Sequence, residues 1–282
     1  MTAHVDMLQL MSELKAADEP FVLATVIRTV SVTAAKAGAK AIIRADGRIE
    51  AGWIGGGCAR GATLKAARAA LADGRSRLVS IQPENLLAEI GVRAGEDRNG
   101  VEFAKNMCPS QGTMDIFVEP MLPAPLLVIL GASPVALALA QQAKPLGYQV
   151  MLAAPLSEVP EVPEVDLVVD GFQLDIPNKR QCFVVVSTQG KGDEAALRAS
   201  LAVDCRYRAF VGSRRKMASL RSKLLAEGIA SARLDEVRAP AGLDLGAITP
   251  EEIALSIIAE ITGLRRQGQR TGTFYQSQTQ EA

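Results

Sequence analysis

The chain has 282 residues, of which 48% are hydrophobic, so it is long enough for about two domains and a substantial core. Lysine plus arginine equals aspartate plus glutamate at 31 each, which provides no global field for binding nucleic acid or an anionic membrane. Because no basic leader opens the chain and no apolar run is long enough to span a bilayer, we expect a cytoplasmic protein without a membrane span.

The first half of the chain alternates between apolar runs and turn signals. Apolar residues from Met7 to Leu14 recur on one helical face, and Phe21 to Val30 is typical of a buried strand. Asp46 and Gly47 lie between two further apolar runs, which predicts a hairpin. The elements predicted after Val30 are strands at Ala41 to Arg44 and Ile49 to Trp53, a helix at Ala59 to Ala72, a strand at Arg77 to Ile81, a less regular charged region at Glu89 to Lys105, and a strand at Met114 to Val118.

Three glycines, Gly55, Gly56 and Gly57, bring Cys58 to the start of the helix predicted over Ala59 to Ala72. We expect Cys58 at or next to the N-cap, where unpaired amides and the helix dipole favour the thiolate form. Glycines also let a ligand approach backbone N–H groups closely. A buried, inert cysteine beside a glycine-rich turn is the alternative that this segment leaves open.

The segment from Pro120 to Pro125 contains three prolines and is the predicted linker. It places an N-terminal domain in residues 1–122 and a second domain in residues 123–264, and we expect residues 265–282 to be disordered. Strands and helices alternate after the linker, which predicts an α/β fold: a small α+β N-terminal domain followed by a Rossmann-like doubly wound parallel sheet. The predicted strands are Leu126 to Leu130, Gln149 to Ala153, Leu167 to Val169, Cys182 to Ser187 and Ala209 to Val211, and the helices are Pro134 to Ala143, Asp193 to Ala202, Lys216 to Ala226 and one from Pro250, capped by Thr249 and Glu252.

The turn after the first strand of this second domain is an incomplete dinucleotide fingerprint. Gly131 keeps the first glycine of GxGxxG, but Ser133 stands where the second glycine normally lets a pyrophosphate approach. Ala153, Ala154 and Pro155 occupy the region where an acidic residue normally binds the ribose. Usual NAD binding is therefore doubtful, whereas a phosphate at the helix start and a purely structural domain both stay open.

A second candidate anion site is the run Ser213-Arg214-Arg215-Lys216, which follows a strand and opens a helix. Three cations beside helix-terminal donors suit an anion, although adjacent cations are also typical of a solvated surface.

The numbers of cysteines and histidines restrict the chemistry. Cys58, Cys108, Cys182 and Cys205 lack the paired spacing of zinc sites and are too sparse for a disulfide scaffold, which is typical of a reducing compartment. His4 is the single histidine and lies near the N-terminus, where we expect it to be solvated and without a role. We therefore expect neither a Ser-His-Asp triad nor a histidine-rich metal site.

Taken together, these motifs resemble the XdhC/CoxI family, accessory proteins that mature molybdenum hydroxylases such as xanthine dehydrogenase and aerobic carbon monoxide dehydrogenase. GAKAIIRADGRIEAGWIGGGCARG is similar to the family's GGC-x-x-G segment, and CPSQGTMDIFVEP is similar to its second cysteine motif. FVGSRRKMASL and APAGLDLGAITPEEIALSIIAEI are similar to its GSRRK and GLD-x-G signatures. Thr188-Gln189-Gly190 replaces a Thr-His-Asp segment of many members, which favours the carbon monoxide dehydrogenase branch, and Gln111 replaces a glycine of CPSGG.

The resemblance implies a site that handles the molybdenum cofactor in its pterin dinucleotide form. It implies roles in that site for Cys58 as ligand or sulfur carrier, for Cys108, for Gly55, Gly56 and Gly57, and for Arg214, Arg215, Gly242, Asp244 and Gly246, with Gly131, Ser133 and Ser213 as candidate phosphate contacts. Soft sulfur suits molybdenum, and phosphates need guanidinium and N–H donors.

The function implied is a maturation factor that binds the cofactor, supports its sulfur modification and delivers it to an apo-hydroxylase. A sulfur donor protein and a homodimer are further partners that the resemblance allows. The alternatives are an oxidoreductase or flavin-handling protein that binds FAD or NAD(P), and an assembly chaperone with neither cofactor; whether the chain is an enzyme stays open.

Overall fold

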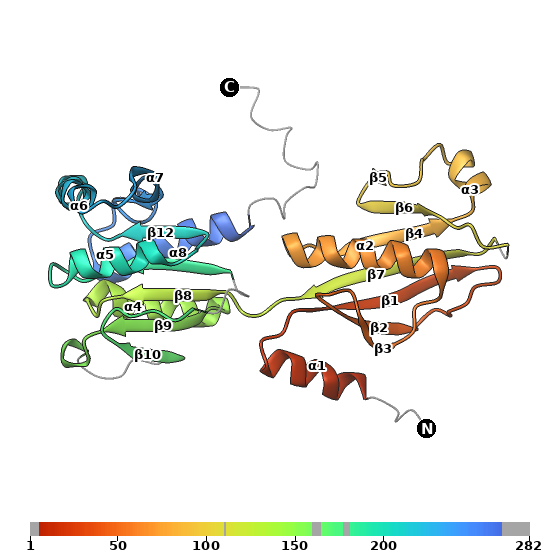
Figure 1. The fold of residues 1–282 in the computed structure, drawn as a ribbon, viewed down its shortest axis with the longest axis horizontal. Helices are drawn as coiled ribbons and strands as arrows, with labels where there is room; N and C mark the ends of the chain where they lie inside the picture. The colour runs from red at the N-terminus through yellow and green to blue at the C-terminus, as the bar shows by residue number, and fades with distance from the viewer. Residues whose placement is uncertain (1–5, 110, 160–164, 177–180, 267–282) are drawn as a thin grey trace. The chain divides into compact units, whose positions relative to one another are not determined.

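The structure, a computed structural model, describes residues 6–109, 111–159, 165–176 and 181–266. The chain divides into two compact units, Met1–Pro123 and Ala124–Ala282, here called the N-terminal and C-terminal units (Figure 1). Each unit has its own core, because every core cluster consists of residues of one unit. His4 and residues 267–282 of the predicted tail lie outside the described residues.

The N-terminal unit is a sheet of seven strands in the order β3-β2-β1-β7-β4-β6-β5. The apolar stretch predicted as a strand is β1, and the predicted hairpin is confirmed by the antiparallel pairing of β2 with β3. Its elements are α1 (Met7–Ala16), β1 (Phe21–Val30), β2 (Lys40–Arg44), β3 (Ile49–Gly52), α2 (Gly57–Asp73), β4 (Arg77–Gln82), α3 (Glu84–Glu89), β5 (Asp97–Arg98), β6 (Val101–Lys105) and β7 (Thr113–Met121).

Two helices cover this sheet from opposite faces (Figure 1). Ala66 and Ala70 of α2 are fully buried in the core shared with β1, β4 and β7, because small side chains let a helix lie close to a sheet. On the other face, Leu14 of α1 packs on Phe21 and Ile42. The amphipathic spacing predicted for Met7 to Leu14 therefore serves this second, smaller core.

Two strand predictions for the N-terminal unit are wrong. The charged region from Glu89 to Lys105 contains the strand β6, which pairs in parallel with β4; its residues are only partly buried, so charged side chains such as Glu102 interrupt the apolar pattern. Strand β7 continues to Met121 instead of ending at Glu119-Pro120. Strand β4 pairs with β7 only as far as Val118, so Pro120 lies where β7 has a single neighbour and tolerates a residue without an N–H.

The C-terminal unit is a parallel sheet of six strands in the order β10-β9-β8-β11-β12-β13. Counted from β8, this is the order 3-2-1-4-5-6 of a Rossmann sheet, which confirms the predicted fold class. Its elements are β8 (Leu126–Leu130), α4 (Pro134–Ala143), η1 (Lys144–Leu146), β9 (Gln149–Ala154), η2 (Leu156–Glu158), β10 (Leu167–Asp170), β11 (Cys182–Val186), α5 (Asp193–Ala202), β12 (Tyr207–Phe210), α6 (Arg214–Ala226), α7 (Ser231–Asp235), β13 (Val237–Arg238) and α8 (Pro250–Arg266).

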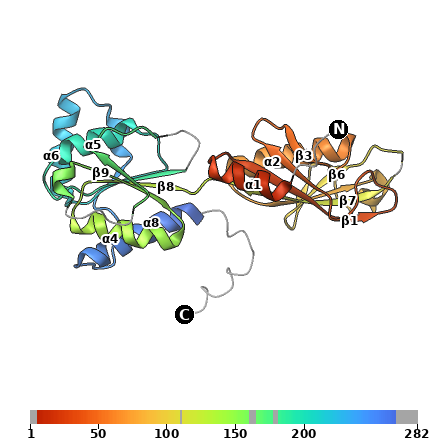
Figure 2. The same ribbon diagram turned by 90° about the horizontal axis from the view of Figure 1, so that it is seen from below.

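Helices lie on both faces of this parallel sheet (Figure 2). Side chains of α4 and α8 bury Leu127 and Ile129, whereas those of α5 and α6 bury the alternate residues Val128 and Leu130. The strands are apolar on both faces for this reason, and β8 is buried along its whole length.

The predicted helix caps are confirmed in detail. The Ser133 hydroxyl accepts the Ala136 N–H at 3.2 Å, with Pro134 in the first turn of α4. At α8, the Thr249 hydroxyl accepts the Glu252 N–H at 3.3 Å and the Glu252 carboxylate accepts the Thr249 N–H at 3.0 Å, which is a capping box. Helix α6 begins two residues earlier than predicted, and α8 includes Arg265 and Arg266, which the sequence analysis assigns to a disordered tail.

Among the residues that the structure describes, none of the helices combines the length and the apolar character needed to cross a bilayer.

Candidate functional site

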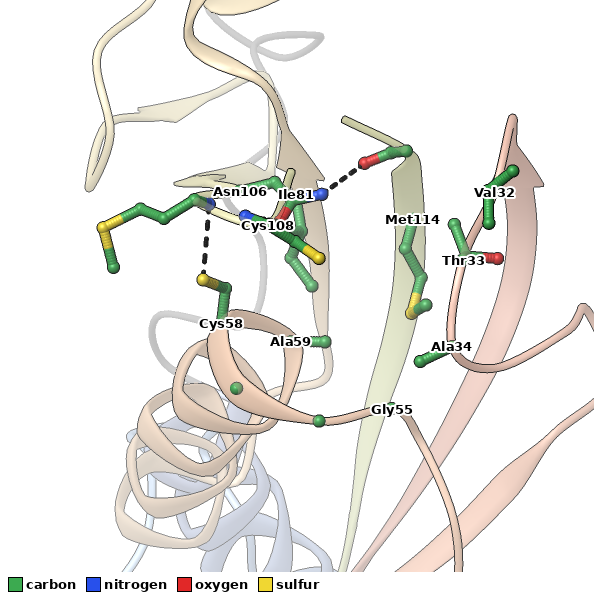
Figure 3. Close-up of a pocket in the computed structure, with 14 residues that line it drawn as sticks. Val32, Thr33, Ala34, Gly55, Cys58, Ala59, Ile81, Asn106, Cys108 and Met114 are labelled. Atoms are coloured by element: carbon green, nitrogen blue, oxygen red, sulfur yellow. Dashed lines mark hydrogen bonds between the residues drawn. The ribbon is translucent and has the colours of Figure 1, made fainter. Parts of the chain in front are cut away.

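The N-terminal unit has a cavity of about 350 Å³ at one edge of its sheet, here called the cysteine cavity (Figure 3). Strands β4 and β6 are parallel to each other and antiparallel to β7, as β1 is, so the carboxyl ends of β1, β4 and β6 meet at this edge. Helix α2 begins there as well. The cavity is lined by Val32, Thr33, Ala34, Gly55, Gly56, Gly57, Cys58, Ala59, Ile81, Asn106, Met107, Cys108, Gly112 and Met114.

Cys58 is the second residue of α2, because the helix begins at Gly57 with Gly56 as its N-cap. The helix thus starts two residues before the predicted Ala59. The Gly56 cap has no side chain to accept an N–H bond, so the first turn of α2 keeps its donors for other partners. The half-buried Cys58 sulfur accepts the backbone N–H of Met107 at 3.3 Å.

Cys108 lies in the loop between β6 and β7 and lines the same cavity as Cys58 (Figure 3). Asn106 holds both sides of this connection: its carboxamide accepts the Cys108 N–H at 2.9 Å and donates to the Gly112 carbonyl at 2.6 Å. The sequence analysis missed Asn106 and Met107. An Asn two residues before a candidate cysteine is a recognisable turn signal, whereas a backbone donor such as Met107 leaves no mark in the sequence.

The three glycines before Cys58, Gly55, Gly56 and Gly57, differ in their structural roles. Gly55 has a φ of +102°, and a Cβ added to it would lie 3.3 Å from the Ala59 Cβ, so it serves the backbone path into α2. At Gly57, an added Cβ would have no neighbour within 4 Å, and at Gly56 the nearest is a Trp53 ring atom at 4.0 Å. The positions beside Cys58 are therefore uncrowded, which leaves room for a bound group.

The other two thiols lie in the C-terminal unit and have different surroundings. Burial in β11 raises the pKa of Cys182 to about 12. Burial also raises the pKa of Cys205, an effect that the nearby Arg208 only partly offsets. Both are therefore protonated thiols near neutral pH, and nucleophilic sulfur chemistry is left to the cysteine cavity.

Gly131 and Ser133 lie at the point where the strand order of the Rossmann sheet reverses, between β8 and β11. The Ser133 hydroxyl contacts the Ser187 hydroxyl at 2.6 Å, and the two residues are 8% and 1% exposed. Gly131 has a φ of +112°, and a Cβ there would be 2.4 Å from the Ser187 carbonyl oxygen. The turn after β8 is thus packed directly against the end of β11.

A second cavity, of about 840 Å³, lies elsewhere in the C-terminal unit, between the start of α6, the segment after β13 and helix α8. We call it the α6–α8 cavity. Among the candidate residues, it is lined by Ser213, Arg214, Gly242, Asp244 and Gly246. Gly131, Ser133 and Arg215 are not among the described residues that line either of these cavities.

The three cations expected to form one cluster have different surroundings in the structure. Lys216 forms an ion pair with Asp193 at the start of α5, so it is not available to a ligand. Burial alone would raise the pKa of Asp193, but hydrogen bonds from Lys216 and Thr188 outweigh that effect and lower it. Of the three cations, only Arg214 lines the α6–α8 cavity.

Glu260 of α8, which the sequence analysis missed, organises one wall of that cavity. Its carboxylate pairs with Arg238 at 2.6 Å, accepts the Tyr207 hydroxyl at 2.6 Å and accepts the Gly242 N–H at 3.1 Å. Burial and the hydrogen bond to Glu260 raise the pKa of Tyr207. Glu260 therefore ties the glycine-containing segment after β13 to α8.

The fold and the site define a two-unit α/β protein, with a thiol-lined cavity in its N-terminal unit and a Rossmann-type sheet in its C-terminal unit. A family model described as the XdhC and CoxI family matches residues 14–82, and one described as the XdhC Rossmann domain matches residues 127–261. The chain belongs to the XdhC and CoxI family.

The known proteins similar to the chain include a curated relative and a solved structure. It is 31% identical over 252 residues to the uncharacterized protein YqeB of Escherichia coli strain K12. That match covers 86% of this chain but only 43% of YqeB, so the chain spans less than half of that relative's length. A crystal structure described as a xanthine dehydrogenase from Bacillus halodurans is 19% identical, covers 96% of this chain and 99% of that one, and has a TM-score of 0.46.

Proposed function

We propose that this protein is a maturation factor that binds the molybdenum cofactor, supports its sulfur modification and delivers it to an apo molybdenum hydroxylase such as carbon monoxide or xanthine dehydrogenase. The observation that carries the proposal is that Cys58 and Cys108, which are far apart in the sequence, line one cavity in a chain of the XdhC and CoxI family.

The residues of the cysteine cavity suit the sulfur-rich end of such a cofactor. Thiolates are preferred ligands of soft metal centres, and two thiols line this cavity. A volume of about 350 Å³ is at the small end of the range for ligand pockets, so this cavity is large enough for part of a pterin dinucleotide only. Among the described residues, no group of three or more His, Cys, Asp or Glu side chains could hold a metal ion without such a cofactor.

Several residues of the cavity then have definable roles. Cys58 acts as ligand or sulfur carrier at the start of α2, where its sulfur accepts the Met107 N–H. Asn106 holds the Cys108 loop in place. When bound, the cofactor supplies the molybdenum and sulfur chemistry that the client enzyme needs.

Molybdenum and pterin analysis of protein purified from a host that makes the cofactor tests this proposal. We expect bound molybdenum in the unaltered protein, a large loss in Cys58→Ser and a smaller loss in Cys108→Ser. Cys205→Ser is the matched control, because this thiol lies outside both cavities and should leave the metal content unchanged. Unchanged molybdenum in both cavity variants, or stoichiometric FAD or NAD(P) instead of pterin, contradicts the proposal and favours the oxidoreductase alternative.

The partners proposed are the apo-hydroxylase, a sulfur donor protein and, in a homodimer, a second copy of the chain, all in the cytoplasm. Activation of a purified apo-hydroxylase by the loaded protein tests delivery. The Cys58→Ser variant should remain folded and fail to activate the client.

A further inference from the structure

The α6–α8 cavity has the size of a site for a small ligand. Its volume of about 840 Å³ lies within the range of ligand pockets, and it is built from three separate segments of the C-terminal unit. It has charged, polar and apolar residues on its walls. A ligand that fills it should therefore carry both charge and a flat or apolar part.

Arg214 is the cation in this cavity that is available for a ligand. Arg238 also lines the cavity, but it is paired with Glu260, and Lys216 is paired with Asp193. Within the described parts of the chain, Arg214 is exposed and forms no ion pair. A guanidinium without a carboxylate partner, at the wall of a cavity, suits a phosphate, which it can bind with two N–H donors.

The segment after β13 contributes a negatively charged side chain, Asp244, to the same cavity. Asp244 lines the cavity, is exposed and forms no ion pair with any described residue. A carboxylate of this kind binds the hydroxyl groups of a ribose in nucleotide sites. Leu243 and Leu245, which are 47% and 56% exposed, line the cavity beside it and offer an apolar surface for a planar ring.

In contrast to the α6–α8 cavity, the position at which Rossmann folds usually bind a nucleotide is filled by packed side chains. In Rossmann sheets the pyrophosphate lies at the strand reversal, above the first glycine-rich turn. Here the Ser133 and Ser187 hydroxyls contact each other at 2.6 Å in that place, and both residues are almost fully buried. The hydroxyl of Ser133 also occupies an N–H donor of the first turn of α4.

We propose that the α6–α8 cavity binds a nucleoside monophosphate group, with Arg214 on the phosphate, Asp244 on the ribose and Leu243 and Leu245 against the base. The group has two sources, a free mononucleotide and the nucleotide half of a pterin dinucleotide. The inference rests on the C-terminal unit alone, so it stands whether or not the cysteine cavity holds molybdenum.

Calorimetric titration of the whole, molybdenum-free protein with AMP, CMP and GMP tests this inference. At least one of them should bind with a Kd of about 1 mM or tighter, and its nucleoside, which lacks the phosphate, should bind at least ~10-fold more weakly. Arg214→Ala should weaken nucleotide binding by about 10-fold. If Asp244 binds the ribose hydroxyls, the unaltered protein should bind the ribonucleotide more tightly than the matching deoxyribonucleotide. Asp244→Asn should weaken ribonucleotide binding and abolish that preference. Both side chains are exposed, so these variants should fold.

Arg215→Ala is the matched control, because Arg215 is the next residue of the same helix, carries the same charge and does not line the cavity. It should leave the Kd within about twofold. An equal loss in Arg215→Ala and Arg214→Ala, or no binding of any mononucleotide, overturns the inference. So does nucleotide-induced change in the amide NMR signals of Gly131 and Ser187 with none at Gly242 and Asp244.

A second titration, with protein loaded with the molybdenum cofactor, identifies the source. If the pterin dinucleotide places its own nucleotide in this cavity, the loaded protein should no longer bind the mononucleotide. If the physiological ligand is a separate nucleotide, binding should persist. Both results support the site, and absence of molybdenum from the protein would contradict the proposed function while leaving the first titration valid.

Discussion

At the residue scale, the four thiols differ because of what surrounds them. Cys58 is half-buried at the start of α2 and accepts an N–H bond, whereas Cys182 lies inside a buried strand with its pKa raised to about 12. Only a thiolate reacts readily with alkylating reagents.

We therefore predict that limiting iodoacetamide at neutral pH labels Cys58 fastest of the four thiols. Labelling of Cys182 should require unfolding, and Cys205, whose pKa is also raised, should react slowly. Peptide mass spectrometry after short reaction times measures the order. Labelling of Cys205 as fast as Cys58 would show that Cys58 is instead the inert structural cysteine.

At the element scale, Asp193 and Lys216 connect the first turns of α5 and α6. The Asp193 carboxylate also accepts hydrogen bonds from the Thr188 hydroxyl and, at 3.1 Å, from the Gly190 N–H. Removal of a buried, hydrogen-bonded charge is costly because its partners keep their desolvation penalty.

Asp193→Asn should lower the free energy of unfolding by about 2 kcal/mol near neutral pH. The pKa of Asp193 is lowered in the folded state, so its contribution is present above the unfolded value of 3.8 and is lost as pH falls through the folded value. The difference in unfolding free energy between variant and unaltered protein should therefore shrink as pH falls from about 5 to about 2, as measured by urea unfolding. Glu194→Gln is the control: Glu194 lies in the same turn, its side chain is 38% exposed and its partner Arg198 is a surface residue, so the change should cost less than about 0.5 kcal/mol.

Helix α8 depends on its capping box. Thr249→Ala removes the hydroxyl that accepts the Glu252 N–H, and we expect a loss of about 1 kcal/mol in urea unfolding. Thr262→Ala makes the same chemical change inside the same helix, where alanine is the better helix former, and should be neutral or stabilising. Equal losses in the two variants would show that the cap is not what stabilises the start of α8.

At the scale of the whole molecule, the core clusters separate by unit. The two cores of the C-terminal unit contain residues from Leu126 onward only, so they should form without the N-terminal unit. A fragment of residues 124–266 should unfold cooperatively by calorimetry and show the helical circular dichroism expected for α4 to α8. A fragment without a cooperative transition would mean that the units fold only together.

Much of the fold could be predicted because the relevant signals are local. The buried strand Phe21–Val30, the hairpin at Asp46-Gly47 and the caps at Ser133 and Thr249 are each specified within about ten residues of sequence. Strand β6 was missed because it is short and only partly buried, so its apolar pattern is weak.

The arrangement of the candidate site was less predictable because it depends on contacts between distant residues. The sequence predicts one cation cluster at Ser213 to Lys216, and only the structure shows that Lys216 forms an ion pair with Asp193. Likewise, Ser133 and Ser187 are 54 residues apart, and nothing local indicates that their hydroxyls meet. The placement of Cys58 and Cys108 on one cavity follows from the strand order of the sheet, which no spacing rule supplies.

The hydrogen bond from the Met107 N–H to the Cys58 sulfur has a mechanical consequence. The atom proposed to carry cargo is also the anchor of the segment that precedes Cys108, so a group attached to that sulfur competes with the anchor. Amide hydrogen exchange at Met107 should therefore accelerate when Cys58 is alkylated, and the same alkylation in Cys58→Ser should leave it unchanged. The exposed segment around Met107 would then change its conformation when the half-buried sulfur carries a group. A partner protein that contacts this segment could therefore recognise whether the sulfur is loaded.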